Sequence, residues 1–319
     1  MRAAPARSWL PPFVLLALIW GCSFLLIQLG LRSLTPVGVA FGRLVLGAIT
    51  LLLVSAVTRT ALPPRGVWRH LFVVALLLNS VPFTLFAYGE TQISSSLAGI
   101  INGAAPLTTV LVVLVAFPEE KPTRERLAGL LLGFLGVVVV LGVWRGLGDG
   151  QWLGIGACVL AVCCYGLAFP YARRHLAGAA GPVSLATGQV CFGALQLVPA
   201  VALTGLTSGP LVASAAWGML ALGCLGSGLA YVLNFRVVAA AGSTTASMVT
   251  YATPVVAVIV GVAFLAEQPQ WNELVGTAVV VAGAALAQGR PRRRARDGAT
   301  NAHRLSTRHP DALVQDRRR

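Results

Sequence analysis

Long apolar runs recur along almost the whole of this 319-residue chain, and they constrain its fold more than any other feature. Hydrophobic residues make up 56% of the sequence and charged residues 11%, whereas a soluble domain carries about 25% charged residues. Each run is about 20 residues long, which is the length that a helix needs to cross a bilayer. The runs cover residues 12–32, 37–57, 68–88, 94–117, 126–144, 152–172, 182–204, 213–237, 243–266 and 272–289.

These runs favour helices over a membrane β-barrel. Barrel strands are short segments in which apolar and polar residues alternate, and the sequence lacks such segments. The mean hydropathy of +0.79 agrees with a chain that lies largely in lipid. The sequence therefore predicts an all-α polytopic membrane protein with ten transmembrane helices.

The chain contains one stretch twice. Residues 94–120 and 242–268 each hold small polar residues, an apolar run, a proline, a second apolar run and an acidic residue. Pro106 and Pro254 lie 148 residues apart, and flanking serine, alanine and glutamate residues match at the same shift. Such self-similarity indicates an internal duplication. Each half of the chain, residues 12–145 and 146–289, holds five runs. Because five is an odd number, the second half crosses the membrane in the opposite sense, which predicts two inverted five-helix (5+5) repeats.

Four parts of the chain follow from this duplication. A basic cytoplasmic leader covers residues 1–11, the first repeat 12–145, the second repeat 146–289, and an Arg-rich tail 290–319. The tail has no apolar periodicity and is predicted to be disordered. Its arginines are expected to lie against anionic lipid headgroups.

The net charge of +14 has an uneven distribution that predicts orientation. Ten of the 24 basic residues follow Gly289, and the predicted loops on the N-terminal side of the membrane hold most of the others. The loops on the opposite side hold only Arg32 and Arg145. Because cytoplasmic loops are enriched in Lys and Arg, we expect a cell (inner or plasma) membrane protein with both termini in the cytoplasm. This distribution argues against a nucleic-acid partner.

The two prolines predict helix breaks in the fourth run of each copy. A proline lacks an N–H, so the carbonyl four residues earlier loses its hydrogen bond. The freed carbonyls belong to Asn102 and Thr250, and Tyr251 follows directly. In lipid, such groups are tolerated only where protein or a water-filled cavity covers them. Paired breaks at Pro106 and Pro254 therefore indicate a substrate site near the midplane, although each proline could also serve packing alone.

Two charged residues near the outer ends of the predicted spans have several explanations. Arg43 could extend to the outer headgroups, face the central cavity as an anchor for an anionic group, or pair with Glu90. Glu90 could be a solvated loop residue, a partner for Arg43, or a proton-titrating group. The sequence leaves these alternatives open.

Candidate substrate-binding residues are the polar and aromatic residues near the predicted midplane. Aromatic rings would enclose a substrate, amides would hydrogen-bond it, and Arg43 would attract an anionic group. The candidates are Trp20, Gln28, Arg43, Asn79, Tyr88, Asn102, Tyr165, Gln189, Tyr231, Thr250 and Tyr251.

No cofactor or metal site is expected. The six cysteines lie in apolar runs without metal-ligand spacing to a histidine, and no phosphate-binding GxxxxGK[ST] motif is present. Clustered acids or histidines of an enzyme are also missing from the spans. Gly129 and Gly133 form a GxxxG pair that indicates close helix packing, either within the fold or in a homodimer.

Several motifs of this chain resemble those of the drug/metabolite transporter superfamily, EamA type. They are the WGCSF run at Trp20–Phe24, the LAGIINGAAPL run at Leu97–Leu107 with its later counterpart TTASMVTYATPV, and the acidic endings Glu119 and Glu267. The resemblance implies an inner-membrane exporter of amino acids, metabolites or drugs, with a cavity between the repeats. The eighth run has no counterpart of Glu90, so the two halves differ chemically.

A secondary exporter that works by alternating access between the repeats is the principal hypothesis. A channel, or a scaffold or receptor that transports nothing, is the alternative. A polytopic membrane enzyme is the third hypothesis. A channel would allow only passive flux, so that no imposed gradient would concentrate the substrate, and this would distinguish it from an exporter.

Overall fold

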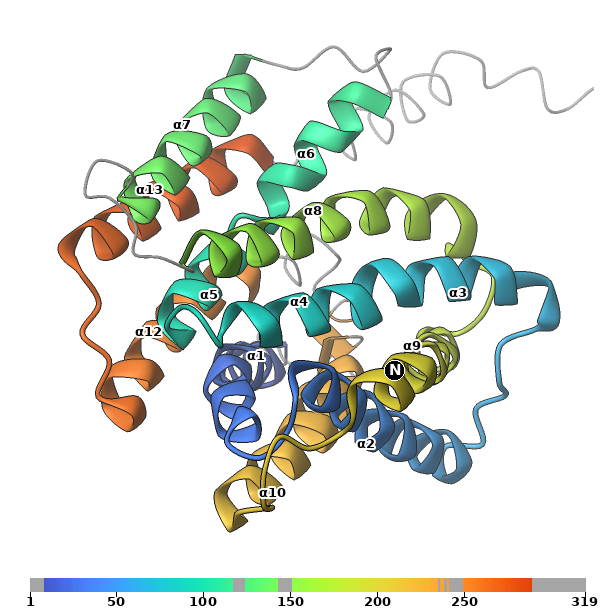
Figure 1. Ribbon diagram of the computed structural model, residues 1–319. Coiled ribbons are helices and arrows are strands. Elements are labelled where there is room, and N and C mark those ends of the chain that lie inside the picture. Colours follow the sequence, from blue (N-terminus) through green and yellow to red (C-terminus); the bar gives the residue numbers. More distant parts are fainter. Residues whose placement is uncertain are drawn as a thin grey trace, which may run out of the picture. The chain divides into compact units, whose positions relative to one another are not determined.

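A computed structural model describes residues 9–116, 124–142, 151–234, 236–237, 240 and 249–288. Every regular element in these ranges is helical (Figure 1). Most of the predicted leader, residues 1–8, and all of the predicted tail, residues 290–319, lie outside them. The helices are α1 Leu10–Leu31, α2 Pro36–Val57, η1 Arg65–Val67, α3 Trp68–Ala75, η2 Leu76–Ser80, α4 Val81–Gly89, α5 Ser95–Asn102, α6 Ala105–Ala116, α7 Arg124–Leu141, α8 Gln151–Leu176, α9 Pro182–Thr204, α10 Ala213–Leu220, η4 Ala221–Leu229, α12 Val249–Leu265 and α13 Trp271–Gln288.

Seven helical segments are long and apolar enough to cross a membrane, and three shorter apolar helices accompany them. The protein is therefore a multi-pass membrane protein, although fewer helices reach spanning length than the ten apolar runs predicted. The shorter helices are Leu127–Leu141, Val249–Leu265 and Trp271–Leu286. Residues next to the first two of these lie outside the described ranges.

Local sequence explains where several helices begin. The Thr35 side chain accepts a hydrogen bond from the Gly38 amide at 3.0 Å, and Pro36 occupies the first turn of α2. A threonine cap followed by proline is a typical helix start, because proline needs no acceptor there. Ser94 caps α5 in the same way through the Leu97 amide at 3.2 Å.

The fourth apolar run is interrupted, as α5 ends at Asn102 and α6 begins at Ala105. Pro106 lies in the first turn of α6, where a missing N–H leaves no intrahelical bond unmade. The expected break at Pro254 is absent, since α12 runs through Pro254 without interruption. Neighbouring helices cover proline kinks in membrane proteins, so a helix need not end there. The Pro254 ring lies against Gly103, where any side chain would collide with it.

Helix contacts recur in equivalent pairs. Helix α1 packs on α12 as α8 packs on α6, and α3 packs on α8 as α10 packs on α1. The closest approaches repeat too: Gly21 lies against Val256, and Gly166 lies against Thr108. Thr108 and Val256 are 148 residues apart. The packing therefore reproduces the sequence duplication, with each crossing made once by each half.

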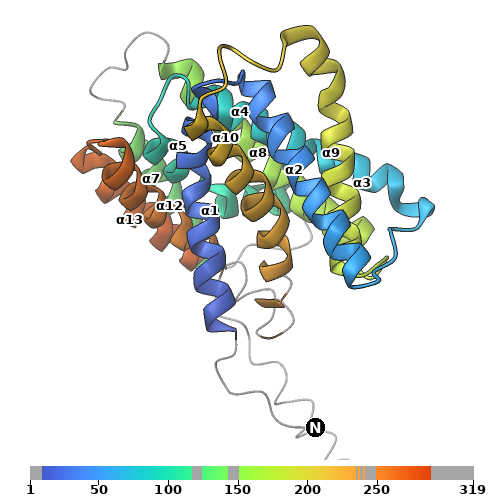
Figure 2. The same cartoon turned by 90° about the horizontal axis from the view of Figure 1, so that it is seen from below.

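Helices α7 and α13 lie side by side at one edge of the bundle in both views (Figures 1 and 2). A side chain at Gly136 would meet the Val280 backbone, and one at Gly276 would meet the Val140 backbone. A side chain at Gly283 would meet the backbone of Gly133. These small residues bring the two backbones into direct contact. Gly133 thus serves packing within the fold, and a homodimer remains a prediction.

The loop after α12 holds the start of α5 through one carboxylate. Glu267 Oε1 accepts hydrogen bonds from the Ser95 amide and hydroxyl, each at 2.8 Å. Glu267 Oε2 accepts from the Ser96 amide at 3.0 Å and from the Ser96 hydroxyl. Both serines are buried. A carboxylate at a helix N-terminus also interacts favourably with the helix dipole, so Glu267 fixes a junction between the two halves.

Glu267→Ala should destabilise the protein, because buried N–H and O–H donors on Ser95 and Ser96 lose their acceptor at a cost of about 1–3 kcal/mol each. We expect a lower midpoint of thermal unfolding for the purified protein in detergent. Gln268→Ala, at the exposed neighbouring position, is the control and should leave the midpoint unchanged. Equal midpoints for the two variants would contradict this role.

Candidate functional site

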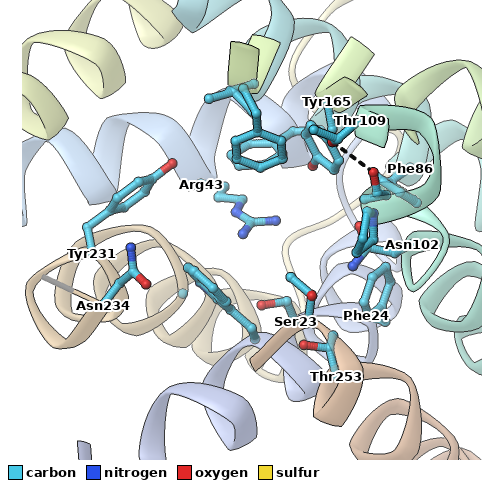
Figure 3. A pocket seen from close by; sticks show the side chains of 18 of the residues that line it. Ser23, Phe24, Arg43, Phe86, Asn102, Thr109, Tyr165, Tyr231, Asn234 and Thr253 are labelled. Atoms are coloured by element: carbon cyan, nitrogen blue, oxygen red, sulfur yellow. Dashed lines mark hydrogen bonds between the residues drawn. The ribbon is translucent and has the colours of Figure 1, made fainter. Parts of the chain in front are cut away.

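A cavity of about 560 Å³ lies among the helices of both halves (Figure 3). This volume falls within the range of small-molecule sites. Its wall is mostly apolar and aromatic, with neutral polar groups and one cation. The lining residues are Trp20, Ser23, Phe24, Ile27, Arg43, Leu78, Phe83, Phe86, Asn102, Ala105, Pro106, Thr109, Val110, Tyr165, Phe169, Gln189, Gly226, Tyr231, Asn234, Thr250 and Thr253.

Residues at equivalent positions of the duplication line this cavity together. Each member of these pairs comes from a different half, and the two positions are 145–148 residues apart. The cavity therefore lies where the two halves meet around their repeated helix crossings. Among these pairs are Trp20 with Tyr165, Phe24 with Phe169, Arg43 with Gln189, and Asn102 with Thr250.

Arg43 supplies the cation. Its guanidinium extends into the middle of the cavity in Figure 3, with Tyr231 on one side and Asn102 on the other. Arg43 Nε donates a hydrogen bond to Ser227 Oγ at 2.8 Å. The guanidinium carbon lies 3.8 Å from the centre of the Phe83 ring, in a cation–π contact. Because the residue is only 8% exposed, it faces the protein interior rather than extending to lipid headgroups.

An amide cluster occupies the position equivalent to Arg43. Gln189 Nε2 donates to Asn79 Oδ1 at 2.6 Å, and Asn79 Nδ2 donates to the Tyr231 hydroxyl at 3.3 Å. Asn79 is fully buried behind the lining and does not reach the cavity wall. Its role is to hold Gln189 and Tyr231.

The Arg43–Ser227 and Gln189–Asn79 contacts are equivalent, because Asn79 and Ser227 are 148 residues apart. Asn79 lies in the π-helical segment η2, and Ser227 lies in the π-helical segment η4. Short π-helical turns occur frequently at functional sites. In each half, a π-helical turn thus places the polar residue that hydrogen-bonds the cavity residue of the other half.

The structure places seven of the predicted site residues in the cavity wall, namely Trp20, Arg43, Asn102, Tyr165, Gln189, Tyr231 and Thr250, together with the predicted helix-break residue Pro106. Other predicted residues lie elsewhere. The Tyr88 side chain is 39% exposed, and the Tyr251 hydroxyl donates to the Ala284 carbonyl at 3.0 Å. Gln28 Nε2 donates to the Glu90 carbonyl at 2.7 Å. Pro254 contacts Gly103 outside the wall.

Glu90 is buried and not a solvated loop residue. Neither of its carboxyl oxygens has a hydrogen-bond partner in the described part of the chain, so it makes no ion-paired contact with Arg43 there. It lies just after the span that ends at Gly89, one turn beyond Phe86 of the cavity wall. Burial raises the pKa of the Glu90 carboxyl well above its ordinary value, because removal from water disfavours the ionised form.

Sequence reasoning missed several lining residues and the partner Ser227. The signal for Ser227 was present, since the 148-residue shift aligns it with the candidate Asn79. Phe169 was likewise recognisable as the counterpart of Phe24. Phe83 carries the same signal, because it lies 148 residues before the candidate Tyr231. Ser23 and Asn234 match no candidate residue at this shift, and only the folded arrangement of the helices turns them toward the cavity.

The described residues contain no group of three or more His, Cys, Asp or Glu side chains able to hold a metal ion. All six cysteines lie within the described ranges and are free thiols. The cavity has the composition of an organic-ligand site: a concave, aromatic wall with a small number of polar groups.

A model of the EamA-like transporter family matches the chain twice, over residues 7–142 and 152–288. Protein PagO of Salmonella typhimurium is 28% identical over 165 residues, about half the length of each chain (51% and 54%). The "Uncharacterized transporter YdfC" of Bacillus subtilis is 26% identical and covers 83% of this chain and 86% of its own.

Two further similarities extend over nearly the whole sequence. A protein of Streptantibioticus cattleyicolor named "Probable terminal-alkyne amino-acid exporter" is 28% identical and covers 91% of this chain and 97% of its own. A crystal structure of another protein has a TM-score of 0.64 at 20% identity, with 89% of this chain and 98% of that chain covered. This last similarity concerns the fold alone.

Asn79→Leu should lower the midpoint of thermal unfolding, because it removes the acceptor of Gln189 and leaves buried polar groups unpaired at about 1–3 kcal/mol each. The double variant Asn79→Leu with Gln189→Leu is the control. It should lose less stability than the sum of the two single variants, since both partners become apolar. A double variant that loses the full sum would contradict the proposed pairing.

Proposed function

The chain belongs to the EamA-like transporter family, and we propose that it is a secondary transporter that exports a small metabolite, amino acid or drug through the cavity between its halves. The proposed mechanism is alternating access, in which two inverted halves exchange conformations and open the same site to either side. Export rather than import follows the name of one relative.

The observation that carries this proposal is the lining of one cavity by equivalent residues of both halves. When two inverted repeats exchange conformations, the point where they meet stays central while the surrounding helices move. A ligand bound between Trp20 and Tyr165, or between Asn102 and Thr250, would keep contacts with both halves during that exchange. An enzyme or a passive pore has no need for such a repeated lining.

The proposed topology has ten crossings as two inverted five-helix repeats, with both termini on the cytoplasmic side of the cell membrane. The uneven distribution of basic residues supports this orientation. Anionic lipids next to the Arg-rich tail, and a homodimer, remain predictions about partners.

Energy is proposed to come from a proton gradient through Glu90. The carboxyl is buried and has no hydrogen-bond partner among the residues that the structure describes. A group held in that state takes up and releases a proton when its surroundings change. The groups that act on it are Arg43 of α2, Glu267 after α12 and Cys158 of α8, with the Gln28 amide of α1 beside its carbonyl. Movement of α8 against α4 would alter this environment.

The transporter proposal is tested by counterflow in proteoliposomes loaded with members of a metabolite panel. We expect transient accumulation of labelled substrate above its equilibrium level, which passive flux through a channel does not produce. Tyr231→Phe should weaken apparent affinity by about 5–10-fold, the value of one hydrogen bond. Tyr171→Phe loses a hydroxyl that bonds His70 away from the cavity and should behave as the natural protein.

The proposal fails if no panel compound shows counterflow with correctly reconstituted protein. Accumulation that never exceeds equilibrium would indicate a channel instead. Equal effects of the two tyrosine variants would remove the cavity as the substrate site, because both lose one hydroxyl and only Tyr231 lines the wall.

Glu90→Gln should abolish stimulation of transport by an imposed pH gradient while counterflow continues, because glutamine resembles the neutral acid but carries no exchangeable charge. The measurement compares initial rates with and without the gradient. Glu125→Gln, at an exposed position of α7, is the control and should keep the stimulation. A Glu90→Gln protein that still responds to the gradient as the natural protein does would exclude this carboxyl as the coupling group.

A further inference from the structure

The cavity wall, as far as the structure describes it, contains a cation and no acid. This imbalance bears on the substrate class of the proposed transporter, on which the inference rests. Arg43 is the charged residue in the lining. The acidic residues with described positions are Glu90, Glu125, Glu267 and Glu273, and none of them lines the cavity. Glu267 accepts its hydrogen bonds from Ser95 and Ser96.

The guanidinium is held so that part of its donor edge stays open. Its Nε is occupied by Ser227 Oγ at 2.8 Å, and one face is covered by the Phe83 ring. The hydrogen bond that Arg43 donates within the described ranges comes from Nε and not from the terminal nitrogens. A guanidinium carries five N–H donors in a planar fork, of which the terminal pair matches a carboxylate in bidentate geometry.

Gly226 keeps the space beside this open edge free. A Cβ atom there would lie 3.9 Å from Arg43 Nη2 and 3.3 Å from Ser23 Oγ. A larger side chain would therefore extend into the region in which an anion would meet the guanidinium. The position lies in the π-helical segment η4 next to Ser227, so the same turn both orients Arg43 and leaves its terminal nitrogens accessible.

A buried cation without a counter-charge is costly, and its cost falls when an anion binds it. One guanidinium compensates one negative charge. A dianion would bring a second, uncompensated charge into the cavity. The ammonium of an amine or a zwitterion would find neutral oxygens and ring faces, but no carboxylate in the described lining.

The rest of the wall suits an apolar body. Aromatic rings surround Arg43 from both halves, and the neutral polar groups are amides and hydroxyls such as Asn102, Asn234 and Thr253. Rings of this kind bury flat apolar groups, whereas scattered neutral donors and acceptors tolerate an uncharged substituent. The volume of about 560 Å³ accommodates a molecule larger than a single carboxylate group.

We propose that the substrate is a monoanionic organic acid with an apolar, preferably aromatic body, whose carboxylate binds the terminal nitrogens of Arg43 beside Gly226 while its body lies among the aromatic rings of both halves.

The test compares probes that share a phenylethyl group, on the natural protein in detergent or nanodiscs, so that it does not depend on a folded variant. The probes are hydrocinnamate, phenylalanine, phenethylamine, methyl hydrocinnamate and the dianion benzylmalonate, at neutral pH. Hydrocinnamate should bind at least about tenfold tighter than each of the others. The amine and the ester lack a carboxylate for Arg43, and the zwitterion and the dianion bring a second charge that the described wall does not compensate. Intrinsic tryptophan fluorescence and isothermal calorimetry measure the affinities.

Two variants locate the site. Arg43→Gln should abolish the preference for hydrocinnamate over its methyl ester. Gly226→Val keeps Arg43 and should weaken hydrocinnamate binding by about tenfold through crowding of the charged pair, with the melting temperature close to that of the natural protein. Unchanged hydrocinnamate affinity in both variants would overturn the proposal.

Hydrocinnamate binding that is absent, or no tighter than that of phenethylamine, would also overturn it. Counterflow separates this failure from a failure of the transporter proposal. If zwitterions or cations show counterflow while monocarboxylates do not, the substrate class is wrong and the transporter function stands. If no compound shows counterflow, the transporter function itself is wrong.

Discussion

Two close helix crossings determine the geometry on which the rest of the structure depends. At Gly21 the first helix touches α12 of the other half, and at Gly166 the first helix of the second half touches α6. Because glycine has no side chain, the helices meet nearly backbone to backbone, and dispersion contacts hold them where lipid supplies no hydrophobic driving force. The residue before each glycine, Trp20 or Tyr165, then lies in the cavity wall. On each of these helices, one glycine thus makes the close contact, and the residue before it places an aromatic ring in the cavity wall.

The interior of a membrane protein requires that polar groups find partners within the fold. Here that requirement is met twice by the same design. Arg43 takes its partner from the second half, and Gln189 takes its partner from the first. Since each bond joins the two halves, a relative movement of the halves would strain or exchange both bonds. The hydrogen bonds of Arg43 and Gln189 therefore depend on the relative position of the two halves.

Much of this arrangement follows from the sequence, and the failures have physical causes. The apolar runs locate the helices to within a few residues, because hydrocarbon thickness fixes helix length. The duplication aligns Arg43 with Gln189 and Asn102 with Thr250, which all reach the cavity. The rotation of a helix about its own axis decides which side chains reach the cavity, and the sequence pattern does not predict it as directly. Tyr251 follows Thr250 directly, yet points to the Ala284 carbonyl. For Glu90 the sequence allowed a solvated loop residue as one of three alternatives, and this one is wrong because the side chain is buried by helices distant in sequence.

The difference between Arg43 and Gln189 has a consequence for how such a molecule is encoded. An assembly of two identical five-helix chains shows every residue twice around its axis, so a central arginine would face its own copy and repel it. Joining both copies in one polypeptide removes this restriction. A single guanidinium then lines the cavity, and an amide occupies the equivalent position of the other half. Two similar halves within one polypeptide therefore permit a single charge in the shared cavity, which two identical chains would carry twice.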